Sequence, residues 1–460
     1  MAGSVQTSPG FSLTPAPSKV TLPGNYITDF NFLDQYLPDT YEKEFERYGN
    51  RSIASFLRAV GAELPSNSDL IKWAEQGRLH TQYTGVTAST FTTGQQVFTV
   101  ANANFRVGQT VILSSATDDV TKKGIVTAVT ASNFTVSYYT NETAAPFTPT
   151  TTTDVVAFVY GSEFKKGTNG MDGALEAESN IFENNPIIIK DKYEVSGSDM
   201  AQIGWVEVTT ENGATGYLWY IKSEHETRLR FEDYMEMSMI EGVPAVDGGA
   251  NSAFDQGYIG TEGMFYTIEN RGNVWAGGNP SALADFDAVI ERLDKQGAIQ
   301  ENVIFLNRQF GFDIDDMLAA QNSYGSPGGT SYGLFDNDEQ MALNLGFTGF
   351  KRGYEFYKTD WKYLNDATLR GGLTAEAING VLVPAGSTTV YDQVLGKNAT
   401  RPFLHVRYRA SETEDRRYKT WITGSAGGAM TSDLDAMEVH FLSERALCTM
   451  GANNFFLFKD

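Results

Sequence analysis

One pentapeptide of the chain could carry a catalytic serine. Gly329-Thr-Ser-Tyr-Gly333 matches the G-x-S-x-G pattern of a nucleophile elbow, with Ser331 as the nucleophile. His405 or His440 could supply the base, with Asp360 as the third member. A real elbow follows a hydrophobic strand, but the residues before this serine are glycine, serine and proline. We therefore expect no hydrolase at Ser331, no catalytic residue elsewhere, and a protein that is not an enzyme.

Two acidic clusters carry the oxygen ligands that calcium prefers. They are Asp313, Asp315 and Asp316, and then Asp336, Asp338 and Glu339. Neither cluster has the glycine and terminal glutamate of an EF-hand loop, and each precedes a predicted helical run. Because acidic side chains favour a helix N-terminus, we interpret both clusters as helix capping.

No metal or cofactor site is expected from the remaining residue types. The four histidines are scattered, at His80, His225, His405 and His440, and the one cysteine is Cys448. This pattern fits neither a zinc site nor an internal disulfide framework. The sequence contains no phosphate-binding P-loop and no dinucleotide fingerprint, so we expect no cofactor.

Composition limits the function classes further. The chain has 460 residues, of which 41% are hydrophobic and 12% aromatic, enough for two or three domains with cores. Its net charge of −22 opposes direct attachment to nucleic acid, which argues against a nucleic-acid-binding module. No apolar run is long enough to span a membrane and no secretory signal is visible, so we expect no membrane association.

The element around which the rest is organised is a long predicted helix at residues 217–241. It ends at Gly242, and Pro244 lies just beyond. Its middle carries charges at helical spacing, Glu224 with Arg228, Glu226 with Arg230 and Arg228 with Glu232, while its two ends are apolar. We expect a rod with two docking ends and a solvated shaft, or else a surface helix of one domain.

Before this helix lie an arm, a helical part and a strand-rich insertion. Residues 1–25 are rich in Gly, Ser and Pro, and Phe11 and Leu13 are among their few apolar anchors. Residues 26–81 show apolar positions every three to four residues, and Ser66-Asn-Ser68 is typical of a helix cap for Leu70, Ile71 and Trp73. Strand candidates recur about every ten residues at 82–160, which predicts an inserted barrel or sandwich of about seventy residues. We expect the Thr-rich tract Thr148-PTTTTD to be the exit linker of this domain.

After the long helix the pattern changes twice. Residues 243–278 read as an irregular crossing, and residues 280–296 form the cleanest amphipathic helix, ended by Gly297. A strand at 302–307, a helix near Phe312 and a loop at 325–333 follow. From residue 350 onward strands dominate, which makes the whole chain α+β.

Basic residues gather on a predicted hairpin near the C-terminus. His405, Arg407 and Arg409 alternate with apolar residues, and Arg416, Arg417 and Lys419 return on the next strand. We interpret this hairpin as a subunit contact, a solvated face, or a contact to DNA or a ligand. The pair Lys165-Lys166, in the Gly-rich segment 161–182, could meet an acidic neighbour across a subunit boundary.

The order of these elements resembles a known family. The extended segment Asn185-PIIIKDKYEVSGSDM, the link Ala201-Gln202 and the long charged helix resemble the major capsid proteins of tailed phages, which have the Hong Kong 97-type fold. The segment Trp73-AEQGRL-His80, leading into an extended arm, resembles the capsid proteins of crAss-like phages in particular.

The resemblance implies a fold and a set of partners. It places an N-arm at 1–25, a helical part at 26–81, a β domain inserted in the E-loop at 82–160, the E-loop return at 161–182, a P-domain with the spine helix at 183–245, an A-domain at 246–349 and further A/P strands at 350–460. It implies self-assembly into the icosahedral head of a tailed double-stranded-DNA phage. The partners would be identical subunits in hexamers and pentamers, with portal, auxiliary or head-fibre proteins, and no sequence-specific DNA binding.

The expected location is the virion, after synthesis in the bacterial cytoplasm. The interface candidates are Phe11, Leu13, Lys165, Lys166, Arg407, Arg409, Arg416 and Arg417. The alternative is another viral or cell-surface structural protein, such as an adhesin, with the β insertion as its binding module.

Overall fold

A computed structural model of the chain describes residues 5–8, 11–13, 56–57, 62–78, 80, 82–101, 104–149, 154–172, 179–201, 208–209, 215–216, 219–249, 251–321, 349–385, 387–392, 397–428 and 430–460. The chain divides into two compact units. The first contains Met1–Phe56, Ile189–Glu236 and Tyr418–Ser443, and the second contains Leu57–Ile188, Met237–Arg417 and Glu444–Asp460. Helices and strands are both abundant in them, which confirms the expected α+β class.

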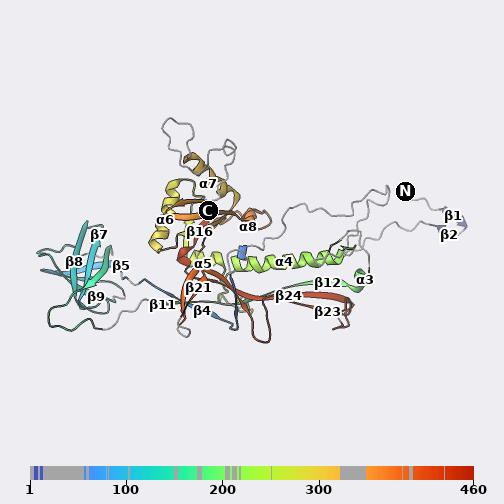
Figure 1. Cartoon of the computed structure of the whole chain (residues 1–460), viewed down its shortest axis with the longest axis horizontal. Coiled ribbons are helices and arrows are strands. Elements are labelled where there is room, and N and C mark those ends of the chain that lie inside the picture. The colour runs from blue at the N-terminus through green and yellow to red at the C-terminus, as the bar shows by residue number, and fades with distance from the viewer. Residues whose placement is uncertain are drawn as a thin grey trace. The chain divides into compact units, whose positions relative to one another are not determined.

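A long helix on a sheet forms the first unit. Helix α4 (Trp219–Glu241) is the predicted long helix, and it runs alongside strands β12 (Ile187–Ser196), β23 (Lys419–Gly424) and β24 (Ala436–Thr449) (Figure 1). Phe231 of α4 is fully buried and its ring lies 5.7 Å from that of Phe441 on β24 and 5.5 Å from that of Tyr418. This aromatic cluster attaches the helix to the sheet.

The middle of α4 is less exposed than its charges suggested. Within the charged stretch Thr227 is buried, His225 and Arg230 are exposed and the other side chains are half-buried, so the shaft is solvated on one side only. Of the predicted helical ion pairs, Arg228 and Glu232 lie 3.8 Å apart, whereas Glu226 faces Lys222 and Arg230 reaches Asp191 on β12. The charged face therefore also contacts the sheet, which spacing along a helix cannot show.

The remaining described elements of the first unit are short. Ser196 caps the four-residue helix α3 by accepting a hydrogen bond from the backbone N–H of Asp199 at 3.2 Å. Helix α3 spans Gly197–Met200, and the other short elements are β1 (Val5–Ser8), β2 (Phe11–Leu13), β13 (Val208–Thr209) and β14 (Thr215–Gly216).

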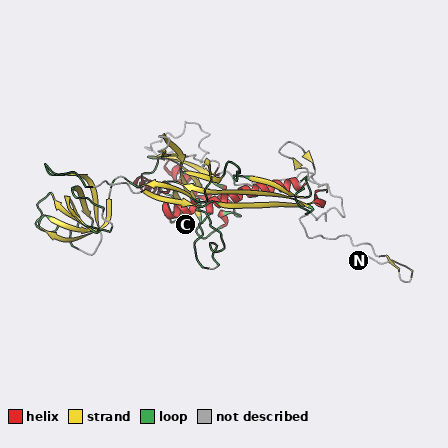
Figure 2. Ribbon diagram, turned by 90° about the horizontal axis from the view of Figure 1, so that it is seen from below, coloured by secondary structure: helices red, strands yellow, loops and turns green. Residues whose placement is uncertain are grey.

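The inserted β domain is a closed six-stranded barrel within the second unit (Figure 2). Its order is β10-β5-β6-β9-β8-β7. The strands are β5 (Gln82–Thr92), β6 (Gln95–Thr99), β7 (Gln109–Ser115), β8 (Val120–Val129), β9 (Asn133–Tyr138) and β10 (Val155–Ser162). Of the two predicted forms, the barrel is the observed one.

The barrel has its own core, built from the inward side of the predicted alternation. Phe98, Phe134 and Phe147 are fully buried, and the rings of Phe105 and Phe134 stack 4.0 Å apart. Such a separate core lets an insertion fold as a module. The Thr-rich tract was expected to be the exit linker of the domain, and this expectation is wrong. Strand β10 follows the tract and closes the barrel by pairing with β5 and β7.

A six-stranded sheet with helices forms a second core in this unit. Its order is β15-β25-β19-β16-β18-β17, and its fully buried side chains include Phe286 of α6, Phe310 of α7 and Phe458 of β25. The strands are β15 (Asn273–Ala276), β16 (Glu301–Leu306), β17 (Gly349–Arg352), β18 (Tyr354–Asp360), β19 (Ile378–Pro384) and β25 (Phe456–Lys459).

The predicted helices around this sheet are confirmed, and one more is present. Helix α6 (Leu283–Gln296) begins slightly later than predicted and ends at Gly297, whose φ of 70° is left-handed. Helix α7 (Arg308–Gln321) follows β16. Helix α5 (Met264–Arg271) lies in the segment expected to be irregular. The short elements are α8 (Lys362–Asn365), η2 (Arg370–Gly372), η3 (Ala452–Asn454), β20 (Ser387–Asp392) and β21 (Lys397–Pro402).

The helix predicted after Ser66 is wrong. Residues there form strands β3 (Ala62–Ser66) and β4 (Ile71–Gln76). Ser68 makes a local turn instead of a cap, since its hydroxyl accepts from the N–H of Leu70 at 3.3 Å. Strand β4 pairs antiparallel with β11 (Ser179–Asn184), a partner more than a hundred residues away that local spacing cannot reveal. The helices expected at 38–60 lie almost entirely outside the described residues.

Candidate assembly surfaces

A two-stranded ribbon, β4 with β11, borders the barrel in the chain. The strands pair from Ser179 opposite Gln76 to Asn184 opposite Ile71. One face carries Trp73 and Phe182, which lie opposite each other, and the other face carries the exposed Ile181 and an ion pair of Lys72 with Glu183 at 2.9 Å. The ribbon therefore has an aromatic face and a face open to solvent.

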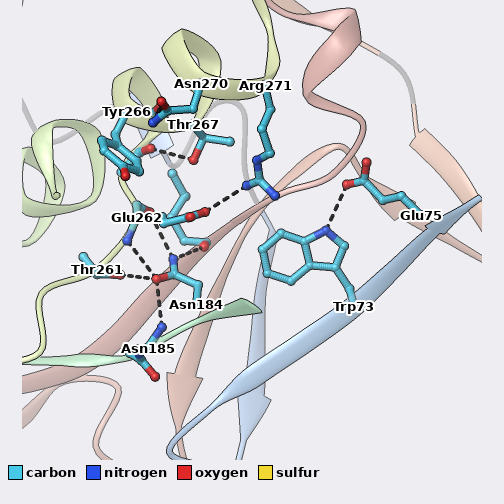
Figure 3. Close-up of polar contacts among 12 residues, drawn as sticks. Trp73, Glu75, Asn184, Asn185, Thr261, Glu262, Tyr266, Thr267, Asn270 and Arg271 are labelled. Carbon is cyan, nitrogen blue, oxygen red and sulfur yellow. Dashed lines mark hydrogen bonds and ion pairs between the residues drawn. The ribbon is translucent and has the colours of Figure 1, made fainter. Parts of the chain in front are cut away.

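Arg271 holds the aromatic face of this ribbon. Its guanidinium lies 4.2 Å from the centroid of the Phe182 ring and 5.7 Å from that of Trp73, and it bonds Glu262 at 2.8 Å (Figure 3). Helix α5 positions Arg271 at its last turn, where a cation also suits the helix dipole. Trp73 donates in turn to Glu75 at 2.9 Å, and Glu75 accepts from the backbone N–H of Gly451 at 3.0 Å.

Asn184 joins the base of the ribbon to two other segments (Figure 3). Its buried side-chain amide donates to the carbonyl of Leu447 at 2.7 Å and to that of Glu262 at 3.0 Å. Its oxygen accepts from the hydroxyl of Thr261 at 3.0 Å and from the backbone N–H groups of Glu262 and Asn185, both at 2.8 Å. All the hydrogen-bonding groups of the amide are used, so it fixes the orientation of β11.

Glu262 carries an unfavourable charge at this junction. Burial raises the pKa of Glu262 above its ordinary value, Arg271 opposes the shift and Glu183 adds to it. The carboxylate is thus retained by its pairing with Arg271 rather than by its surroundings. The junction is a polar clamp of the kind that positions a structural arm.

The basic stripe predicted near the C-terminus takes part in ion pairs within the chain. Arg409 contacts Asp69 and lies 3.9 Å from Glu444, and Arg416 bonds Glu444 at 2.6 Å. Arg417 contacts Glu63.

Sequence reasoning missed a fourth arginine in this network. Arg445 is buried, bonds the carbonyl of Arg417 at 2.9 Å and lies 3.5 Å from Glu63. Burial lowers the pKa of Arg445. The four arginines and their acidic partners all belong to the second unit, so these ion pairs are part of its internal structure.

The predicted hairpin itself is wrong. Strand β22 (Leu404–Arg409) pairs with residues 445–449 of β24 and, in parallel, with β3. A short turn follows β22, with a bridge of Ala410 to Asp415 and a hydrogen bond from the backbone N–H of Arg416 to the carbonyl of Arg409 at 2.9 Å, but β23 pairs with β24 separately. His405 is buried, and Arg407 is half-buried with an Nε atom that has no hydrogen-bond partner among the described residues.

The other predicted interface residues lie apart from this network. Lys165 and Lys166 are exposed just after the barrel's last strand. Phe11 and Leu13 begin and end β2, which pairs with β1. None of the described contacts brings these four residues together with the arginines.

The candidate chemistry is not assembled in the described residues. Ser331 and the cluster at Asp336, Asp338 and Glu339 lie outside them. His405 and Asp360 belong to the second unit and His440 to the first. Among the described residues, no group of three or more His, Cys, Asp or Glu side chains could hold a metal ion. No described helix is both long and apolar enough to cross a membrane.

The acidic cluster in α7 does not cap the helix. Asp313 accepts hydrogen bonds from Asn279 at 2.7 Å and Gln309 at 3.0 Å, and Asp315 bonds Lys358. The helix starts earlier, where Asn307 accepts from the backbone N–H of Phe310 at 2.8 Å. The capping interpretation of this cluster is wrong because the helix begins before it.

Exposed apolar side chains on ordered backbone are the features that sequence reasoning did not single out. They include Tyr139 and Phe164, which follow β9 and β10 of the barrel, and Val246 and Tyr258 in the loop after α4. Large apolar patches on an ordered surface usually mark contacts with other molecules. For Phe164 and Tyr258 the sequence signal is an aromatic residue placed in a glycine-rich segment.

No protein-family model matches the sequence, and no curated protein does. Several solved structures align with most of the chain. A chain from Gordonia phage Cozz is 10% identical over 97% of this chain and 98% of that chain, with a TM-score of 0.40. A chain of the mature capsid of bacteriophage PhiM1 is 8% identical over 92% and 91%, with a TM-score of 0.41. A chain of the capsid of a native GTA particle is 10% identical over 92% and 96%, with a TM-score of 0.40. At these values the likeness carries no conclusion about function.

Proposed function

We propose that the chain is a major capsid protein of a tailed phage, which self-assembles into the icosahedral head around double-stranded DNA. The observation that supports this most directly is the order of its elements. A ribbon that bears an inserted barrel is followed by β12, the 23-residue helix α4, a helix–strand–helix segment and returning strands. This is the order that the resemblance to the Hong Kong 97-type fold implied.

In this proposal each part of the chain has a structural task. The ribbon β4–β11 and the barrel form the E-loop, α4 with β12, β23 and β24 forms the P-domain, and the six-stranded sheet with α6 and α7 forms the A-domain. We propose further that the chain is related to the capsid proteins of crAss-like phages, which rests on the resemblance of the sequence segment 73–80 alone.

Rigidity within the subunit would let a shell be built from modest contacts. Phe231 attaches α4 to its sheet, and Asn184 and Arg271 orient the ribbon. Parts that are each held in one conformation lose little conformational freedom on binding a neighbour, so many weak contacts can sum to a stable lattice. Because of its net charge of −22, the chain would enclose the DNA without binding it tightly. Portal, auxiliary or head-fibre proteins would be further partners.

The test is the assembly state of the intact protein. We expect the purified full chain to form pentamers, hexamers or closed shells, visible by electron microscopy and by a concentration-dependent sedimentation coefficient. A chain that stays monomeric at every concentration up to the millimolar range overturns the proposal. Selective binding of the full chain on a glycan array, with no self-association, would instead favour the adhesin-like alternative.

A further inference from the structure

One end of the barrel carries a group of exposed apolar side chains, which we call the barrel-end face. Its members are Val107, Tyr139, Tyr160 and Phe164, with exposed fractions of 52%, 50%, 46% and 41%. Four large apolar side chains this exposed on one small domain need an explanation, because single scattered exposures are normal but grouped ones are not.

Contacts of adjoining residues bring these members together, since the backbone N–H of Glu163 donates to the carbonyl of Gly108 at 2.8 Å and that of Tyr139 donates to the carbonyl of Lys123 at 3.2 Å. The Tyr139 hydroxyl donates to the carboxylate of Glu163 at 2.5 Å, and the ammonium of Lys123 lies 5.9 Å from the centroid of the Tyr160 ring. Gly108 leaves room for the Phe164 ring, since a Cβ atom there would come within 2.6 Å of it. Exposed Lys165 and Lys166 directly follow Phe164 and, together with Lys123, outnumber the carboxylate of Glu163, so the margin of the face is net cationic.

Charge sets the barrel apart from the rest of the chain. Residues 82–172 contain five basic and six acidic side chains, a net charge of −1, whereas the whole chain carries −22. Two copies of so acidic a chain repel each other in most orientations. An approach through the nearly neutral barrel avoids that repulsion.

A second exposed apolar surface lies in the loop between α4 and α5, residues 243–260, which we call the post-spine loop. Its exposed side chains are Val243, Val246, Phe254, Tyr258 and Ile259, with exposed fractions of 58%, 74%, 48%, 66% and 50%. The loop contains Asp247 and Asp255 and no lysine or arginine. It is therefore apolar with an acidic margin.

The post-spine loop is built to hold its shape. Pro244 bridges Gly260, and the backbone N–H of Ala245 donates to the carbonyl of Ile259 at 2.8 Å. Gly260 has a φ of +70°, and a Cβ atom there would lie 2.4 Å from the carbonyl oxygen of Val243. Such an Ω-shaped loop, closed at its ends, presents its apolar side chains without first having to order.

We propose that the barrel-end face of one copy docks on the post-spine loop of a second copy. This inference rests on the proposed function, because it names the partner surface of an assembly contact. The two surfaces are both apolar, differ in sequence and have opposite marginal charges, with Lys123, Lys165 and Lys166 facing Asp247 and Asp255. A contact between two different surfaces of the same chain is heterologous, so repeating it produces rings or lattices instead of closed pairs.

A photo-crosslink tests the contact directly. The full chain with p-benzoylphenylalanine in place of Phe164 is assembled, irradiated and digested, and crosslinked peptides are identified by mass spectrometry. We expect inter-copy crosslinks to residues 243–263. Assembled protein whose crosslinks from position 164 fall elsewhere overturns this inference and leaves the proposed function standing. Protein that does not assemble overturns both.

Charge reversal tests the same contact by compensation. Lys165→Glu/Lys166→Glu, or Asp247→Lys, should weaken self-association about tenfold at low salt, and combining the three changes should restore much of it. Because Asp255 accepts a hydrogen bond from Ser252 at 3.1 Å, it is left unchanged. The control Lys190→Glu/Arg292→Glu makes the same charge change at exposed positions elsewhere and should have little effect. A combined variant as weak as the lysine variant contradicts the pairing.

Discussion

The guanidinium of Arg271 lies 4.2 Å from the centroid of the Phe182 ring, so the last turn of a helix holds a strand of the ribbon by its aromatic face. The same group bonds Glu262, which in turn surrounds the Asn184 amide with its backbone. One cation thus links helix α5, the ribbon and the loop before the helix. The stability of the ribbon should depend on it.

Replacing Arg271 should loosen the ribbon. Arg271→Met keeps the length of the side chain but removes the cation over Phe182 and leaves Glu262 without its ion pair, which should cost about 1–3 kcal/mol. Hydrogen exchange should accelerate in β4 and β11 more than in the barrel. Arg292→Met, on the exposed face of α6, is the matched control. Unchanged exchange in both strands would show that the contact is incidental.

Glu262 should make stability depend on pH in a defined direction. Its pKa is raised in the folded protein, so between its ordinary pKa of 4.5 and the raised value the folded state binds more protons than the unfolded state. The free energy of unfolding should therefore fall as the pH rises through that window. In Glu262→Gln, whose amide can still accept from Arg271, this part of the slope should disappear from urea titrations at stepped pH. An identical slope in the variant contradicts the assignment.

Asn184 should be far more sensitive than its neighbour on the same strand. Asn184→Ala leaves the buried carbonyl of Leu447 and the N–H of Glu262 without partners, at a cost of about 2–4 kcal/mol. Asn180→Ala, at an exposed position of β11, should change stability by less than about 0.5 kcal/mol. Thermal melts followed by circular dichroism compare the two. Equal effects would remove Asn184 from its structural role.

Phe231 should carry the attachment of α4 to its sheet. Phe231→Ala empties a fully buried site between Tyr418 and Phe441 and should cost about 3–5 kcal/mol. Tyr234→Ala, one turn along the same helix and 41% exposed, should cost much less. Guanidinium unfolding of both variants measures the difference. Similar losses would mean that the helix is held mainly by other contacts.

Elements with strong local periodicity could be predicted from the sequence. The alternation of residues 95–138 has its apolar side in one small core, and helix α6 has Phe286, Val289 and Leu293 buried on one stripe. In both places the local pattern and the tertiary environment agree. Where the two agree, the secondary structure of a segment can be predicted from its own residues.

The elements that were predicted wrongly or not at all depend on residues far away in the sequence. Strand β4 has only six residues, and its alternation of Ile71, Trp73 and Glu75 was outweighed by a serine-rich cap signal. Its strand state comes from pairing with β11. The clamp was invisible for the same reason, because Asn184, Glu262 and Leu447 meet only in the folded chain. Likewise the acids that neutralise Arg409, Arg416 and Arg417 come from Glu63, Asp69 and Glu444.

The closed barrel should resist aggregation when many copies are concentrated together. All six strands have neighbours on both sides, so the domain offers no open strand to which another chain could add by backbone hydrogen bonding. Many identical copies could be concentrated side by side with little danger of fusing into cross-β aggregates.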